Sequence, residues 1–177
     1  MNTNAKNLTI AVQLLAVILS GMLFRVSDVW AKEKMAAMDK QIQGTWRLVS
    51  LYVDKDGEKI NAFGINPRGS MILTPNGRFS VIFMNATLPK FAANNRRNGS
   101  AEENQAVVQG SLAYFGSYEI VNAKEQLVRF KIEGSTYPNW DGEAQKLVMT
   151  VTGDEMKVVN HTPTIGGTGH PVWKRLD

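Results

Sequence analysis

The chain carries few side chains that commonly do chemistry. Among its 177 residues two are histidines, His161 and His170, and none is cysteine. Without cysteine there is no disulfide framework, no thiolate metal site and no cysteine nucleophile. Two histidines also argue against a His-based zinc site. We therefore predict neither a metal nor a cofactor.

The best candidate for proton transfer is His161, which follows Asn160. Histidine is the usual general base near neutral pH. The alternation of side chains along this stretch turns His161 outward, however, and no serine or cysteine nucleophile motif accompanies it. A second motif, Ile165 to Gly169, is rich in glycine like a phosphate-binding loop, but such loops open a helix and here a strand is expected. These residues leave open whether the chain is an enzyme.

The first 31 residues have the composition of a secretory signal peptide. Lys6 precedes an apolar run from Leu8 to Phe24, and Val29-Trp30-Ala31 gives a small-x-small ending, so we expect cleavage after Ala31. An uncleaved anchor or a buried core helix are the alternatives. The first two predict a periplasmic or secreted domain, which would touch a membrane only through an uncleaved N-terminal segment. Residues 32–43 then form a lead-in, either a charged helix or a linker.

The charge of the chain excludes one class of partner. The formal net charge is +4, and without residues 1–31 there remain 18 basic and 15 acidic residues. No run of adjacent basic residues is longer than a pair such as Arg96-Arg97. Nucleic-acid-binding proteins usually carry a basic stripe together with stacking aromatic residues, so we predict no nucleic-acid partner.

The elements that must position any site are short strands. Runs of β-branched and aromatic residues separated by turn residues predict eight of them. Pro75-Asn76-Gly77 and Gly153-Asp154 are typical of tight hairpin turns. Ser100 with Glu103 forms a capping box, which predicts one helix running to about Phe115 and including Ala113 and Tyr114. The expected strands cover residues 45–53, 70–74, 78–84, 117–121, 127–133, 146–152, 155–161 and 171–175.

Eight short strands in one small domain favour an all-β fold. Closing the sheet removes its exposed edges, so we expect an eight-stranded antiparallel up-and-down barrel with one short helix over residues 44–177. The interior of such a barrel is either filled by side chains or holds one small ligand.

The ends of this region resemble a known family. Gly44-Thr45-Trp46 is similar to the Gly-x-Trp start of lipocalins, and Trp173-Lys174-Arg175 ends the last strand. With Asn76-Gly77-Arg78, Tyr114–Tyr118 and Tyr137–Gly142, they resemble the bacterial and fungal lipocalin-like domain family, which has a calycin-type barrel. The resemblance implies that Trp46 and Arg175 close the barrel floor by a cation–π contact. Family members often carry histidines where this chain has Arg129 and Lys131, so no acid–base role is transferred.

Alternation along the strands identifies the residues expected to face the lumen. Trp140, in the connection Tyr137–Gly142, is either a lid over the mouth or a residue packed on the wall. The predicted ligand-binding residues are Tyr52, Tyr118, Phe130, Trp140, Met149, Val158 and Asn160.

This lining is apolar with a few polar groups, which suits an apolar or aromatic small molecule. Our first hypothesis is therefore an exported lipocalin-like barrel that binds such a molecule in its lumen. The alternative is an enzyme of secondary metabolism, of the cyclase or isomerase type, that uses the same pocket. A third possibility is an envelope interaction protein whose barrel is filled.

Overall fold

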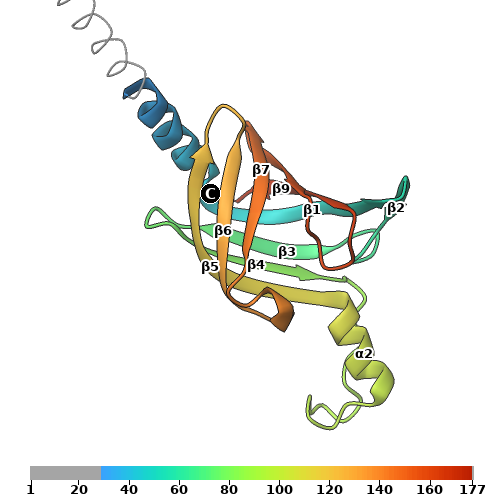
Figure 1. Cartoon of the computed structure of the whole chain (residues 1–177). Coiled ribbons are helices and arrows are strands. Elements are labelled where there is room, and N and C mark those ends of the chain that lie inside the picture. The colour runs from blue at the N-terminus through green and yellow to red at the C-terminus, as the bar shows by residue number, and fades with distance from the viewer. Residues whose placement is uncertain (1–28, 177) are drawn as a thin grey trace, which may run out of the picture.

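A computed structural model describes residues 29–176 of the chain (Figure 1). Most of the predicted signal peptide lies outside the described residues, and its cleavage stays a prediction. Residues 29–42 form a helix, which we call the N-terminal helix. The further helices are α2 (Ala101–Gly110) and the short 3-10 helix η1 (Pro138–Trp140). The strands are β1 (Gly44–Lys55), β2 (Glu58–Ile60), β3 (Arg68–Leu73), β4 (Arg78–Met84), β5 (Ser111–Asn122), β6 (Leu127–Ser135), β7 (Ala144–Thr152), β8 (Glu155–Asn160) and β9 (Thr168–Arg175).

Eight of these strands close into an antiparallel barrel, which confirms the predicted fold class. Strands β3 to β9 pair with one another in chain order, and β1 pairs with both β3 and β9. The short β2, which the sequence did not predict, pairs only with the end of β1.

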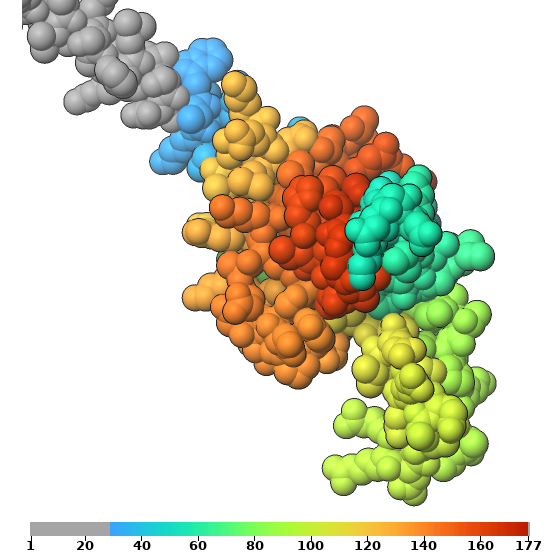
Figure 2. Space-filling model, turned by 45° about the vertical axis from the view of Figure 1, so that its right-hand side comes forward, coloured from blue at the N-terminus to red at the C-terminus, as the bar shows by residue number. Residues whose placement is uncertain are grey.

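The two ends of the barrel are built differently. The floor holds the turns after β3, β5 and β7, together with the start of β1 and the end of β9. The N-terminal helix lies at this end in Figure 1. The mouth is formed by the connections 61–67, 85–110, 136–143 and 161–167. Figure 2 shows α2 and its preceding loop projecting from the mouth, away from the N-terminal helix.

Both predicted hairpin turns are present, and the helix begins as its capping box requires. Gly77 and Gly153 take positive φ values of 73° and 57°, which glycine adopts without steric cost. Ser100 accepts a hydrogen bond from the backbone of Glu103, whose carboxylate accepts one from the backbone of Ser100. These local signals were sufficient because each depends on neighbouring residues alone.

The predicted end of that helix is wrong. The helix stops at Gly110, and Ala113 and Tyr114 belong to β5, which starts at Ser111. The hydroxyl of Ser111 donates to the carbonyl of Val107 and so caps the last turn. Residues 111–117 then pair with β4, and this pairing overrides the local helical pattern.

The lead-in segment belongs to the folded domain. Met38 and Ile42, on the N-terminal helix, are both buried, and Ile42 is 0% exposed. Their side chains join the same core as the inward-facing residues of the barrel. The segment is therefore a helix that packs on the barrel floor and not a linker.

Candidate ligand-binding site

The floor of the barrel is closed by Trp46 and Arg175. The guanidinium carbon of Arg175 lies 4.1 Å from the centre of the Trp46 ring, which is 0% exposed. The indole N–H of Trp46 donates to the carbonyl of Ile42 at 2.9 Å. Arg175 donates to the carbonyls of Gln41 and Gln43, both at 2.6 Å. These bonds satisfy carbonyls at the end of the N-terminal helix, where a cation is favoured, and fix the helix to the floor.

The inward orientation predicted for Tyr52 is wrong. The pairing of β1 with β9 shifts between Leu48 and Ser50, so one extra residue of β1 is accommodated there. Such a bulge reverses which side chains face the lumen. Leu51 and Val53 consequently line the interior, while the Tyr52 ring stacks on His170 outside, with centroids 4.7 Å apart.

Tyr118 and Met149 face inward but lie too close to the floor to line the cavity described below. The Tyr118 hydroxyl is 3.0 Å from Asp39 Oδ1 and 2.9 Å from the carbonyl oxygen of Thr74. Burial, together with the negative charge of Asp39, raises the pKa of Tyr118. Met149 is 1% exposed and lies beside Met38 and Ile42. Both residues thus hold the N-terminal helix and are not placed to touch a ligand above them.

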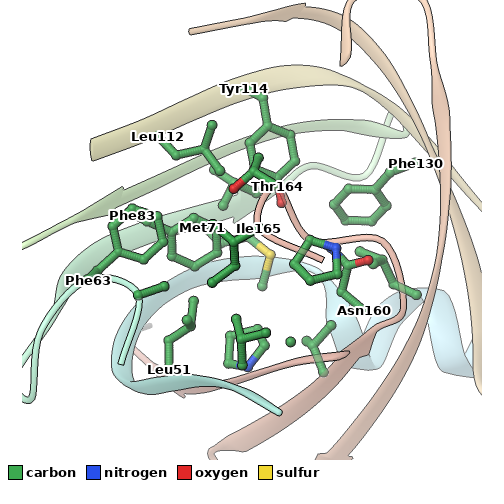
Figure 3. A pocket seen from close by; sticks show the side chains of 18 of the residues that line it. Leu51, Phe63, Met71, Phe83, Leu112, Tyr114, Phe130, Asn160, Thr164 and Ile165 are labelled. Atoms are coloured by element: carbon green, nitrogen blue, oxygen red, sulfur yellow. The ribbon is translucent and has the colours of Figure 1, made fainter. Parts of the chain in front are cut away.

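Nearer the mouth, the barrel interior contains an apolar cavity of about 60 Å³. Figure 3 shows labelled side chains from several strands pointing toward this space. Four of the predicted ligand-binding residues line it: Phe130, Trp140, Val158 and Asn160. The wall is completed mainly by Leu51, Val53, Phe63, Met71, Val81, Phe83, Leu112, Tyr114, Leu147 and Trp173.

Of the two positions that the sequence left open for Trp140, the structure shows the one packed on the wall. It ends η1 in the connection between β6 and β7, at the mouth, and it lines the cavity. Its ring also packs edge-on against Tyr114, with centroids 5.2 Å apart, and against Tyr137 at 5.8 Å. Trp140 is therefore a wall residue at the rim, held by two aromatic neighbours.

A loop of residues 161–167 covers part of the cavity. Pro163, Thr164 and Ile165 line the cavity from this loop, and the ammonium of Lys55 donates to the Ile165 carbonyl at 3.2 Å. A Cβ added to Gly167, whose φ is +81°, would lie 2.3 Å from the Asp54 carbonyl oxygen. Glycine is thus required for this loop to lie against β1. The strand β9 follows, so the stretch is a connector and not a phosphate loop.

The cavity has few polar groups. Asn160 lines it, but its side-chain oxygen already accepts hydrogen bonds from the backbone N–H and hydroxyl of Thr162. Tyr114 points into the cavity in Figure 3, and burial raises the pKa of its phenol. No charged side chain is among the described residues that line the space.

Sequence reasoning missed one buried polar residue, Gln145. Its side chain is 3% exposed, and among the described residues neither its amide nitrogen nor its amide oxygen has a hydrogen-bond partner. The same alternation that places Leu147 inward also places Gln145 inward, but the predicted strand began one residue later, at Lys146. Extending it by one residue would have identified Gln145.

Outside the cavity, the described residues offer few side chains suited to catalysis or metal binding. His161 is exposed, and its Nδ1 lies 3.4 Å from the Thr168 hydroxyl. Within residues 29–176, histidine and acidic side chains form no cluster that could hold a metal ion. Over the same residues, no helix is long and apolar enough to span a membrane.

Comparison with known proteins places the fold in a family. Three solved structures match this chain at low similarity: the REP1-NXSQ fatty acid transporter, a fatty-acid-binding protein 1 from Echinococcus granulosus, and the wild-type fluorescent protein UnaG. Their identities are 12%, 10% and 10%, and their TM-scores 0.37, 0.37 and 0.36. The matches cover 78%, 78% and 77% of this chain and 98%, 99% and 98% of those chains. At these values they carry no inference about a ligand.

A search of curated proteins gives no significant match. The sequence profile of the lipocalin-like domain family, in contrast, matches residues 43–172, which span the barrel from its first strand into its last. The chain therefore belongs to the lipocalin-like domain family.

Proposed function

We propose that this protein binds a small apolar or aromatic molecule in the lumen of its barrel. The observation that carries the proposal is the cavity beneath the mouth, whose wall is almost entirely aliphatic and aromatic. Small-molecule sites commonly combine such a wall with a few polar groups. An enzyme would need convergent acid and base groups, and Tyr114 is the one titratable residue among those lining the cavity.

The size of the cavity sets a condition for binding. A space of ~150 Å³ holds one benzene ring, which is larger than the 60 Å³ present here. Ligand entry therefore requires part of the wall to move, and we expect loop 161–167 to be the segment that moves. Ile165 is 41% exposed, and its carbonyl accepts a hydrogen bond from Lys55 at the end of β1.

Apolar contact should supply most of the affinity. Burying an aromatic ligand of ~200 Å² at ~25 cal/mol per Å² contributes about 5 kcal/mol before the costs of association. Part of that gain is spent on opening the loop. We therefore expect a Kd of about 0.2 mM or weaker for a simple aromatic probe.

The test is titration with N-phenyl-1-naphthylamine, a neutral aromatic probe whose fluorescence rises in apolar surroundings. We expect saturable binding to the wild type. Val158→Trp fills the cavity and should abolish binding of the probe, whereas Lys157→Ala, on the outer face of the same strand, should leave this binding unchanged. Circular dichroism checks that both variants fold. Equal binding by both variants, or none by the wild type, contradicts the proposal.

We further propose that the protein is exported, to the periplasm or out of the cell. The support is the sequence of residues 1–31, with Lys6, its apolar run and the Val29-Trp30-Ala31 ending. Mass spectrometry of protein recovered from its own host should give a chain starting at Lys32. A chain starting at Met1 contradicts cleavage and leaves the anchor alternative.

A further inference from the structure

Gln145 has an environment that a purely structural residue seldom has. It lies on the inward face of β7, directly opposite Phe130 on β6 and two residues from Leu147 on the same strand. Phe130 and Leu147 both line the cavity, whereas Gln145 is not itself a lining residue and lies beside these two in the wall. The Gln145 amide is nonetheless without a hydrogen-bond partner among the described residues. Burying an unpaired amide is costly, so a bound molecule or an ordered water must supply the partner.

The charge of the site restricts that molecule. A carboxylate moved into this lumen would meet no cation, because the described lining residues are all uncharged. Lys55 lies exposed at the mouth, and its ammonium donates to the Ile165 carbonyl. Burying an ionised group without a partner costs far more than burying a neutral polar one. The lumen should therefore reject ionised acids.

The chemistry of the amide restricts it further. A glutamine side chain offers two N–H donors and an oxygen acceptor, so it pairs with a hydroxyl or a carbonyl group equally well. The Tyr114 side chain, whose hydroxyl can also donate or accept, lines the cavity itself (Figure 3). Both groups are complementary to a neutral polar substituent on an otherwise apolar ligand.

We propose that Gln145 determines specificity by hydrogen-bonding the single hydroxyl or carbonyl group of a compact, neutral aromatic ligand. This inference rests on the proposed function, because it assumes that the lumen is occupied. It names the chemical class of the ligand and the residue that selects it.

The experiment compares three molecules with one ring system: naphthalene, 2-naphthol and 2-naphthoate. Each is titrated at neutral pH against bound N-phenyl-1-naphthylamine on the wild type, on Gln145→Leu and on Gln105→Leu. Gln105 is exposed on α2, so it controls for the same substitution outside the lumen. Thermal unfolding of each variant reports its stability.

We expect the wild type to bind 2-naphthol about five- to tenfold more tightly than naphthalene, the value of one hydrogen bond. It should bind 2-naphthoate at least about tenfold more weakly than 2-naphthol. Gln145→Leu should remove the preference for 2-naphthol while keeping naphthalene binding, and it should melt no lower than the wild type, since it deletes an unpaired amide. Gln105→Leu should behave like the wild type.

Three results would overturn the proposal. If Gln145→Leu still prefers 2-naphthol, a residue other than Gln145 determines the selectivity. If the wild type binds 2-naphthol and naphthalene equally, water satisfies the Gln145 amide. Tight binding of 2-naphthoate removes the restriction to neutral ligands. In these cases the naphthylamine probe still binds, so the proposed function stands; if the probe does not bind the wild type, the proposed function fails as well. Gln145→Met replaces Gln145→Leu if the latter does not fold.

Discussion

Replacing Trp46 with alanine should nearly unfold this protein. The indole is 0% exposed, and truncating a buried tryptophan typically costs about 3–5 kcal/mol. The variant also loses the cation–π contact of Arg175, about 0.5–2 kcal/mol, and leaves the Ile42 carbonyl without its donor. These losses overlap, so we expect a total of about 4–6 kcal/mol. Domains of this kind are stable by only about 5–15 kcal/mol.

The measurement is urea unfolding followed by far-ultraviolet circular dichroism, with the free energy of unfolding compared between variants. Trp46→Phe is the matched control, because it keeps a ring beneath Arg175 and removes the N–H donor to Ile42. It should cost about 1–3 kcal/mol. The reasoning is refuted if Trp46→Ala unfolds at the wild-type urea concentration but no longer binds the naphthylamine probe, since Trp46 would then be a binding residue.

Three further predictions test other parts of the fold. Ile42→Ala should cost about 2–5 kcal/mol of unfolding free energy, although Ile42 precedes the predicted barrel, whereas the exposed Lys40→Ala should cost little; equal urea midpoints would show that the N-terminal helix does not stabilise the barrel. Hydrogen bonds from the backbone N–H groups of Ala92 and Ser100 lower the pKa of the Glu103 carboxyl. These hydrogen bonds stabilise α2 fully above the unfolded pKa of ~4.3, and this stabilisation is lost as the pH falls through the lower folded pKa. The protection of the α2 amides from hydrogen exchange, measured relative to the intrinsic exchange rate at each pH, should therefore fall in acid more for the wild type than for Glu103→Gln. Identical profiles would contradict this origin. Gly167→Ala should displace loop 161–167 and speed association of the naphthylamine probe in stopped-flow measurements, while Gly153→Ala, also at positive φ but with open space around its Cβ, should not; unchanged association in both would show that the loop does not gate the cavity.

The barrel itself could be predicted because its signals are local or periodic. Apolar alternation identified the inward face of regular strands, as for Phe130 and Val158, since side chains of a strand point alternately to opposite sides. Turn residues such as Gly77 and the capping box at Ser100 act over four residues or fewer. The family resemblance supplied the pairing of Trp46 with Arg175, which no local pattern could provide.

The candidate site was predicted less well, because alternation gives the face of a residue and not its depth. Tyr118 and Phe130 both face inward, yet Tyr118 bonds to Asp39 at the floor while Phe130 lines the cavity. The predicted orientation of Tyr52 was wrong for a different reason. A bulge adds one residue to β1, and a single added residue moves every following side chain to the other face.

The sequence by itself determined the strands, their turns and the apolar character of the lumen, because these follow from residue types and a period of two. Tertiary structure alone decided how much of that lumen stays empty. Met149 and Tyr118 fill the lower barrel against the N-terminal helix, and the wall side chains leave about 60 Å³ above them. It also decided that Gln145 is buried with no hydrogen-bond partner among residues 29–176. Free volume and unpaired polar groups depend on side chains packed from distant segments, and no pattern within one segment records them.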